Sequence, residues 1–165
     1  MINKTRFENE FREISKFGAL QGGGLTRLAF SKEEKEAREY LKTLIDEAGL
    51  SVKEDSVGNI FARFDKVENP DLAPVSVGSH IDSVPNGGFY DGTLGVMAGL
   101  EAIRAIKESG AKLNRPLELI VFACEESSRF KMATVGSKIV AGKLGLDDLH
   151  KLKDGNGISL FQAME

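Results

Sequence analysis

Two short apolar runs flank an amphipathic segment in the middle of the chain, and this arrangement limits the fold more than any other feature of the sequence. The runs cover residues 75–78 and 117–123, and each has the length of a short strand. Between them, apolar residues recur at helical spacing over residues 94–108. A strand, a helix and a second strand form a βαβ unit, which predicts an α/β fold whose ligands collect beyond the carboxyl ends of the strands.

Other local patterns predict helices and strands around that unit. The clearest is a helix that begins after Ser31, where Glu34 completes a capping box, and ends at Gly49. The Gly58–Asn59 pair marks a bulge or bend inside a strand. The remaining expected elements are helices over residues 4–17 and 137–142, strands over residues 50–54 and 57–64, and a turn at residues 154–157.

Composition excludes several classes of function. The 22 Lys and Arg residues against 25 Asp and Glu residues leave a formal net charge of -3 with no basic block, so no nucleic-acid partner is expected. No apolar stretch approaches the roughly 20 residues that cross a bilayer, so no membrane segment is expected. A single cysteine, Cys124, cannot form an internal disulfide, and the polar first residues do not resemble a signal peptide. We therefore expect a cytoplasmic protein.

His80 and Asp82 follow the first strand of the βαβ unit. Residues two apart in an extended chain point the same way, so both side chains can reach one site. A metal-binding imidazole commonly donates its second nitrogen to a carboxylate, which is the role that Asp82 could fill. An isolated HxD sequence also fits a histidine that only fills a strand end, so this pair alone leaves both interpretations open.

Asp91 lies in a glycine-rich loop directly before the predicted helix of the βαβ unit. The carboxylate could simply cap that helix, because the free N–H groups and the helix dipole favour a negative charge there. The glycines in front of Asp91 also suit close approach of the backbone to an ion or ligand. A capping role and a metal-ligand role both remain open.

Glu125 and Glu126 follow the second strand of the unit. Two adjacent carboxylates repel each other, so their position at the edge of a core favours a neutralising cation. Because neighbouring side chains point in different directions, one could bind the metal while the other acts as general base. An exposed acidic turn is the alternative. Cys124 is expected to be a small packing residue outside the site.

One histidine with several carboxylates suits Zn, Mn, Co or Ni, and a shared carboxylate can hold two ions about 3.5 to 4 Å apart. Hydrolysis is the chemistry that such a pair of ions commonly supports. The sequence contains neither a GxxxxGK[ST] loop nor a strand-GxGxxG-helix unit, so a nucleotide-binding enzyme is disfavoured.

Two long motifs contain these residues: GSHIDSVPNGGFYDGTLGVMAGLEAI and VFACEESSRFKMATVGSKIVAGKLG. Together with the earlier GLTRLAFSKEEKEAREYLKTLIDEAGL and DSVGNIFARF, they resemble the amidase, hydantoinase/carbamoylase group of the M20 metallopeptidase clan, from about Gly24 to the end of the chain. The resemblance implies a three-layer α/β/α catalytic domain with a central mixed sheet, similar to that of zinc aminopeptidases. It also implies hydrolysis of C–N bonds in N-carbamoyl amino acids or ureido compounds such as allantoate.

The resemblance assigns a role to each candidate residue. It makes His80 a ligand of one divalent ion, Asp91 the carboxylate that bridges both ions, and Glu126 a ligand of the second. Glu125 becomes the general base, and Asp82 supports His80. The implied cofactors are two Zn ions, or Mn, Co or Ni. The family often has glycine where this chain has Ser127, a mild departure from the pattern.

The resemblance also implies parts that these 165 residues do not include. Family members have a later HIEQ-like segment, a histidine near the carboxyl end, and an inserted lid and dimerisation domain. The second histidine here, His150, matches no ligand motif and is expected at the surface. We therefore expect residues 1–165 to be the amino-terminal part of the catalytic domain of an enzyme that is a homodimer when complete, with sheet edges left exposed.

Two other functions stay open at this point. A dipeptidase or aminoacylase of the same clan is one, although the GLTRLAFS and EESSRF segments look like the carbamoylase branch. The other is an inactive fragment that serves at most as an interaction module.

Overall fold

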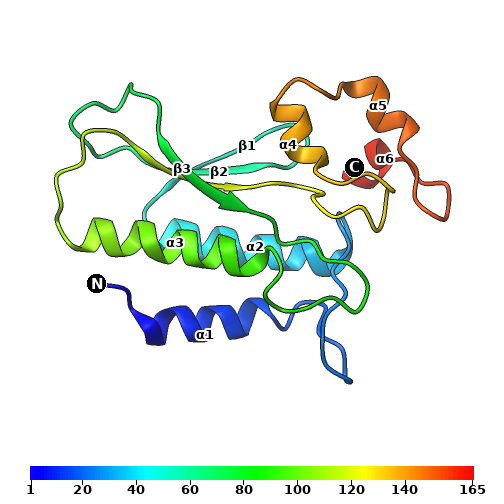
Figure 1. Ribbon diagram of the computed structural model, residues 1–165, viewed down its shortest axis with the longest axis horizontal. Helices are drawn as coiled ribbons and strands as arrows, with labels where there is room; N and C mark the ends of the chain where they lie inside the picture. The colour runs from blue at the N-terminus through cyan, green and yellow to red at the C-terminus, as the bar shows by residue number, and fades with distance from the viewer.

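The computed structural model describes residues 1–165 as a mixed sheet with helices packed on one face (Figure 1). In chain order the elements are α1 (Lys4–Ile14), α2 (Lys32–Glu47), β1 (Ser51–Glu54), β2 (Ile60–Phe64), β3 (Val75–Ser79), α3 (Thr93–Glu108), β4 (Leu117–Val121), α4 (Val135–Val140), α5 (Leu146–Lys151) and α6 (Leu160–Met164). The strand order is β1-β2-β4-β3, with β3 parallel to β4 and the other pairs antiparallel. The predicted βαβ unit and mixed α/β sheet are confirmed.

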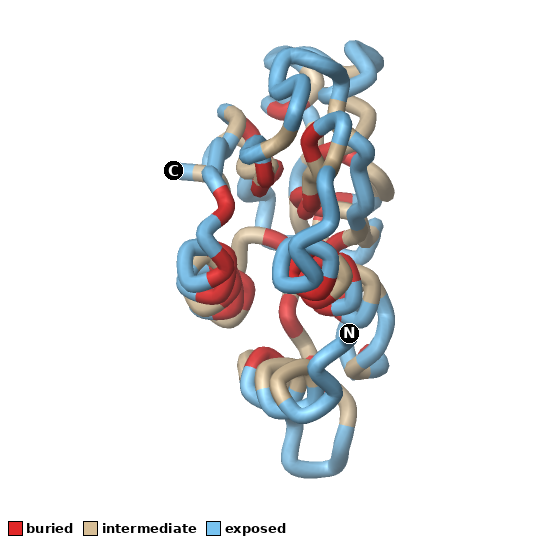
Figure 2. The backbone as a smooth tube through the Cα atoms, turned by 90° about the vertical axis from the view of Figure 1, so that its left-hand side faces the viewer, coloured by how far each residue is buried: buried red, intermediate tan, exposed pale blue.

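Helices α2 and α3 cover one face of the sheet, and α1 packs on the far side of those two helices. Figure 2 shows the buried residues concentrated where these layers meet. The main core lies between the sheet and the two helices, and its fully buried members include Leu41, Ile60, Leu100 and Leu119. No helix lies over the opposite face of the sheet (Figure 1), so the chain supplies only part of the three-layer arrangement that was expected.

The predicted capping box at Ser31 is only half formed. The Ser31 hydroxyl accepts the Glu34 N–H, as a helix N-cap does. The Glu34 carboxylate does not return to Ser31, because it lies buried and accepts a hydrogen bond from Arg38 one turn later. The helix therefore begins where predicted, but an ion pair within the helix has replaced the second half of the motif.

Two predicted boundaries differ from the structure. Helix α1 ends at Ile14 instead of residue 17, and the chain then turns to Gly18, whose φ is +84°. Strand β2 begins at Ile60 instead of residue 57, because the Asp55 carboxylate accepts backbone N–H groups of the following residues and folds residues 55–58 into a hairpin turn. Gly58 occupies that turn with φ +86° and is not a bulge inside the strand.

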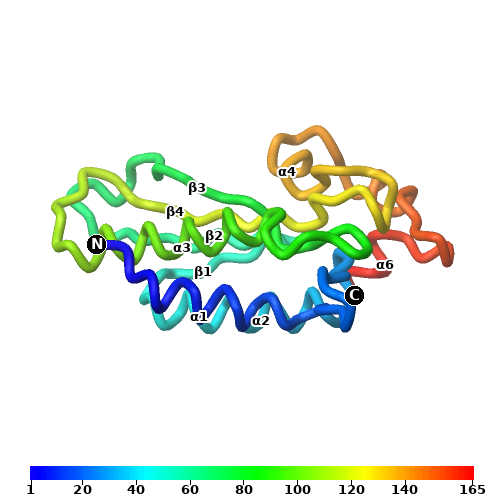
Figure 3. The backbone as a smooth tube through the Cα atoms, turned by 60° about the horizontal axis from the view of Figure 1, so that its bottom comes forward, coloured from blue at the N-terminus to red at the C-terminus, as the bar shows by residue number.

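Helices α4, α5 and α6 lie beyond one end of the sheet (Figure 3) and enclose a second, smaller hydrophobic core. The α4 prediction was displaced by about two residues, and α5 and α6 were not predicted. His150 is exposed on α5 and stacks against Phe161 of α6, with 4.3 Å between the ring centroids, so its predicted surface position is confirmed. None of the helices combines the length and apolar character that a bilayer crossing would need.

Candidate metal centre

The candidate residues meet at the carboxyl ends of two parallel strands, the position expected for a ligand site in an α/β sheet. His80 follows β3, the Glu125–Glu126 pair follows β4, and Asp91 precedes α3. Each of His80, Asp91 and Glu126 offers one ligand atom, and these three atoms lie within 4.8 Å of one another. The structure thus brings together three side chains that are far apart in the sequence.

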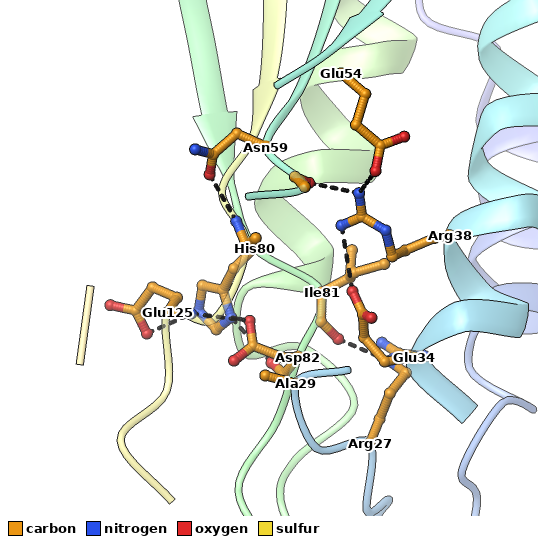
Figure 4. Close-up of polar contacts among 12 residues, drawn as sticks. Arg27, Ala29, Glu34, Arg38, Glu54, Asn59, His80, Ile81, Asp82 and Glu125 are labelled. Carbon is orange, nitrogen blue, oxygen red and sulfur yellow. Dashed lines mark hydrogen bonds and ion pairs between the residues drawn. The ribbon is translucent and has the colours of Figure 1, made fainter. Parts of the chain in front are cut away.

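The His80 ring is held by its own loop. Its Nδ1 lies 2.9 Å from the backbone carbonyl oxygen of Asp82, and a carbonyl can only accept, so this nitrogen carries the proton. The other nitrogen, Nε2, lies 3.5 Å from Glu125 Oε2 (Figure 4). It also lies 3.9 Å from Asp91 Oδ1. When the ring is neutral, Nε2 is therefore the unprotonated nitrogen, and it faces the carboxylates as a metal ligand requires.

Asp82 joins the two strand ends. Its carboxylate lies 3.5 Å from His80 Nδ1, whose shorter contact is with the Asp82 backbone carbonyl, so support of the imidazole by the carboxylate stays a prediction. The same carboxylate also accepts the backbone N–H groups of Glu125 and Glu126, at 3.2 and 3.0 Å. This second role was not visible in the sequence, because it depends on the side-by-side placement of β3 and β4. Asp82 is 2% exposed and therefore acts from inside the protein.

The two glutamates diverge because the backbone before them turns sharply. Cys124 adopts a left-handed conformation with φ +50°, and the chain returns to pair with residues 134–136. Glu126 then joins the cluster with His80 and Asp91, while Glu125 Oε2 lies 3.5 Å from His80 Nε2. Cys124 is buried in the second core, as predicted, and burial raises the pKa of its thiol, so it is an inert packing residue.

Asp91 does not cap α3. The N-cap position is Gly92, and no side chain caps this helix end. The Asp91 side chain is 70% exposed and faces Nε2 of His80. Gly92 has φ +65°, and a Cβ built there would lie 2.4 Å from Cε1 of His80. Glycine is thus needed at this position for both its backbone conformation and its lack of a side chain, since it lets the loop close against the imidazole.

The charges of the cluster favour a cation. Burial alone would lower the pKa of the His80 imidazole, but the hydrogen bonding and charge of Asp82, together with the charge of Glu125, outweigh it and raise the pKa to about 9. Partial burial raises the pKa of Glu126, and the charges of Asp91, Glu125 and Asp82 raise it further against the opposing effect of His80. An imidazole nitrogen with carboxylate oxygens is a suitable donor set for Zn or Mn, so the residues fit a divalent ion.

Comparison with known proteins places this site in a family. Residues 76–160 match the model of Peptidase family M20/M25/M40. The chain belongs to this M20 family. Within it, the chain is 41% identical over its whole length to an N-carbamoyl-L-amino acid amidohydrolase of Geobacillus stearothermophilus, and 41% identical over 98% of its length to a ureidoglycolate hydrolase of Arabidopsis thaliana.

A solved structure identifies the branch of the M20 family. The crystal structure of a hydantoinase/carbamoylase family amidase from Burkholderia ambifaria matches 99% of this chain with a TM-score of 0.92 and 37% identity. The chain is thus an M20 chain of the hydantoinase/carbamoylase type, as its motifs indicated. It spans about 40% of the length of the Geobacillus relative and 40% of the Burkholderia chain.

The M20 site also depends on residues that the sequence did not single out. Asn59, at the start of β2, is fully buried, and its Oδ1 accepts the Ala123 N–H while its Nδ2 donates to Asp55 and to the Gly136 carbonyl. This one carboxamide ties the end of β4 to the start of α4, the two segments that frame the glutamate loop. An asparagine in a hairpin reads as a turn residue, so no local signal distinguishes it.

Proposed function

We propose that this chain contributes to a metal-dependent amidohydrolase that cleaves a C–N bond in N-carbamoyl amino acids or related ureido compounds. The observation that carries the proposal is the convergence of His80, Asp91 and Glu126, with Glu125 next to them. The names of the relatives, an N-carbamoyl-L-amino acid amidohydrolase and a ureidoglycolate hydrolase, support this substrate class. Two divalent ions, Zn or else Mn, Co or Ni, are the proposed cofactors.

In the proposed mechanism, His80, Asp91 and Glu126 would hold the ions, and Asp91 would be the carboxylate that serves both. Bound divalent ions would polarise the scissile carbonyl and lower the pKa of the attacking water. Glu125 takes the proton from that water and returns it to the leaving nitrogen. Asp82 keeps the backbone of Glu125 fixed relative to His80 through the two N–H groups that it accepts.

Three donor side chains in the cluster are too few to complete two four-coordinate sites. We therefore propose that the missing ligands, and most contacts to the substrate, come from outside residues 1–165, in a longer homodimeric protein of the cytoplasm. The shared length of about 40% with the relatives supports this view. On this basis the isolated chain should bind one ion instead of two and should not turn over substrate.

A chimera tests the proposed function. Residues 1–165 would replace the matching segment of the Geobacillus relative, and hydrolysis of N-carbamoyl-L-amino acids and ureidoglycolate would be measured before and after treatment with a chelator. We expect hydrolysis that chelation abolishes and added Zn or Mn restores. A folded chimera that binds the ions and hydrolyses none of these compounds would contradict the proposed substrate class, and activity unaffected by chelation would contradict the metal centre.

A further inference from the structure

Arg27 places a charged guanidinium in the interior directly behind the metal centre. The residue is 0% exposed, and all three of its guanidinium nitrogens are hydrogen bonded. Its Nε donates to the Ile81 carbonyl at 2.7 Å, and Nη2 donates to the Thr93 hydroxyl, also at 2.7 Å. Its Nη1 donates to the carbonyls of Ile14 and Phe17, at 2.9 and 3.2 Å.

The partners of Arg27 belong to the segments that carry the proposed ligands. Ile81 lies between His80 and Asp82, so its carbonyl belongs to the loop that orients the imidazole (Figure 4). Thr93 is the first residue of α3 and follows Asp91 by two positions. One planar group therefore spans the His80 loop and the Asp91 loop, which approach each other from different elements.

The third contact of Arg27 fixes the guanidinium in place. Ile14 is the last residue of α1, and the carbonyls at a helix end carry partial negative charge that favours a cation. The backbone adds two more links, since the Arg27 N–H donates to the Ser83 hydroxyl and the Ser83 N–H donates to the Arg27 carbonyl. Arg27 is thus held against three separate parts of the chain.

This arrangement is costly, because no carboxylate lies within ion-pair distance of the buried guanidinium. Burial lowers the pKa of Arg27 to about 10, although the charges of Glu34 and Asp82 oppose this effect. The side chain therefore stays charged at neutral pH. A lysine could not reproduce the contacts, since a single ammonium cannot donate along the fixed directions of the planar fork.

We propose that Arg27 is a positioning residue of the metal centre: its guanidinium sets the separation of the His80 loop and the Asp91 loop, using the end of α1 as its fixed point. The inference rests on the metal centre of the proposed function but assigns a residue that does not touch the ions. Residues that orient ligands in this way commonly change metal affinity roughly 10- to 100-fold when replaced.

The most direct test removes one acceptor of Arg27 without changing the charge of the site. Thr93→Val keeps the shape of the side chain and removes the hydroxyl, whereas Thr93→Ser keeps the hydroxyl. We expect Thr93→Val to weaken Co²⁺ binding by the 165-residue chain about tenfold and Thr93→Ser to change it by less than about twofold. Co²⁺ absorption spectroscopy at a temperature where every variant is folded measures both.

A matched arginine separates positioning from general stability. Arg104 is also buried, donates to the Leu44 backbone carbonyl and contacts Glu10 of α1. It lies on α3, eleven positions after Thr93 and away from the metal centre. Arg27→Lys should weaken Co²⁺ binding at least as much as Thr93→Val, and combining the two should add little, because they break the same link. Arg104→Lys should lower thermal stability and leave Co²⁺ affinity unchanged.

A second readout needs no metal. The chain has two histidines, and His150 lies on α5, far along the chain from the Arg27 contacts. In metal-free protein, Thr93→Val should move the imidazole NMR signals of His80 and leave those of His150 in place, and Thr93→Ser should move neither.

The outcomes distinguish the two proposals. If the wild-type chain binds Co²⁺ and Thr93→Val binds it equally well with unchanged His80 signals, the positioning role of Arg27 is wrong and the metal centre stands. Equal losses of Co²⁺ affinity in Arg104→Lys and Arg27→Lys would also overturn the positioning role. Failure of the wild-type chain to bind Co²⁺ would contradict the metal centre itself.

Discussion

Three contacts constrain His80, and they explain how a residue in a loop can present a ligand in one orientation. The Asp82 carbonyl fixes its Nδ1, the backbone of Gly92 lies against its ring, and Arg27 holds the carbonyl of the next residue, Ile81. Preorganisation of this kind reduces the free-energy cost of ordering the ligand side chains when a metal binds. The ring therefore needs little rearrangement to accept an ion through Nε2.

Glu125→Gln separates metal binding from proton transfer. The amide keeps the size of the side chain but cannot take a proton, so we expect the chimera with this change to retain its metal content and to lose turnover by about 100-fold or more. Metal analysis beside the hydrolysis assay checks both. His80→Ala is the contrasting variant and should lose metal. Normal turnover in Glu125→Gln would contradict the general-base role.

Gly92→Ala should displace the His80 ring. The added Cβ would lie 2.4 Å from Cε1 of the imidazole. The backbone at φ +65° and ψ −56° adds strain of about 1–3 kcal/mol for a residue with a side chain. Gly142→Ala is the matched control, because Gly142 has φ +66° with nothing within 4 Å of the added Cβ. We expect both variants to lose stability in urea unfolding and only Gly92→Ala to lose Co²⁺ affinity. Equal Co²⁺ affinities of Gly92→Ala and the wild type would show that the position of the His80 ring does not depend on the missing side chain at residue 92.

At the scale of the elements, the site depends on which strand ends lie next to each other in the sheet. Strands β3 and β4 are parallel neighbours, so their carboxyl ends deliver His80 and Glu125 to one edge without any long loop. Buried side-chain amides and ion pairs then fix the connecting segments. Two of these, Asn59 and Arg6, lead to separate predictions.

Asn59→Ala should loosen the end of β4. The substitution leaves the buried Ala123 N–H and the Gly136 carbonyl without their partner, and each unsatisfied buried group costs about 1–3 kcal/mol. We expect a loss of about 2–4 kcal/mol in the free energy of unfolding, measured by urea denaturation. Asn69→Ala, at an exposed asparagine that bonds Asn114, should cost less than about 0.5 kcal/mol. Equal losses in the two variants would contradict the bridging role of Asn59.

Arg6→Ala should detach α1 from α3. Arg6 Nε lies 2.8 Å from Glu101 Oε2, and the Glu101 side chain is only 3% exposed. Removal of Arg6 leaves this buried carboxylate with the Asn3 N–H as its remaining partner. Loss of one partner of a buried pair costs about 3–5 kcal/mol, and the low end applies because Arg6 is itself partly exposed. Hydrogen exchange should then show faster exchange in α1. Lys4→Ala, which breaks an exposed pair with Glu8, should leave exchange unchanged, and similar exchange in both variants would count against the Arg6 contact.

The sequence predicted the parts of this site that follow local patterns. His80, Asp91, Glu125 and Glu126 each stand at the end of a strand or the start of a helix, and the apolar spacing of the βαβ unit located those ends. The supporting role of Arg27 could not be predicted, since its partners lie up to 66 positions away and a buried arginine has no sequence pattern. The short helices α5 and α6 were missed because their apolar faces complete a second core that only exists after folding.

For the molecule as a whole, the two edge strands of the sheet, β1 and β3, differ in charge. Strand β1 is charged at Lys53 and Glu54, which discourages pairing with another chain. Strand β3 has the sequence VSVGS, without a charge, and its Val75 and Val77 are 57% and 43% exposed. The β3 edge is therefore the part of this chain most open to association.

Val75→Lys should reduce self-association of the 165-residue chain. Sedimentation velocity over a range of concentrations should show association of the wild type that weakens when a charge is placed on the β3 edge. Val140→Lys makes the same change at a 53% exposed valine of α4 and should leave association unchanged. Equally strong self-association of the wild type, Val75→Lys and Val140→Lys would show that another surface drives association.

The place of β4 in the sheet has a consequence for synthesis. β4 is the last strand of the chain, yet it lies between β2 and β3. At about 5–20 residues per second, the roughly fifty residues that separate β2 from β4 take about 3–10 seconds to emerge from the ribosome. Throughout that interval the inner edge of β2 lacks its partner, and the inner edge of β3 lacks its partner from the time β3 emerges. The time that nascent chains spend in this state, and the chaperones that bind them meanwhile, should govern the yield of native protein more than the stability of the finished fold.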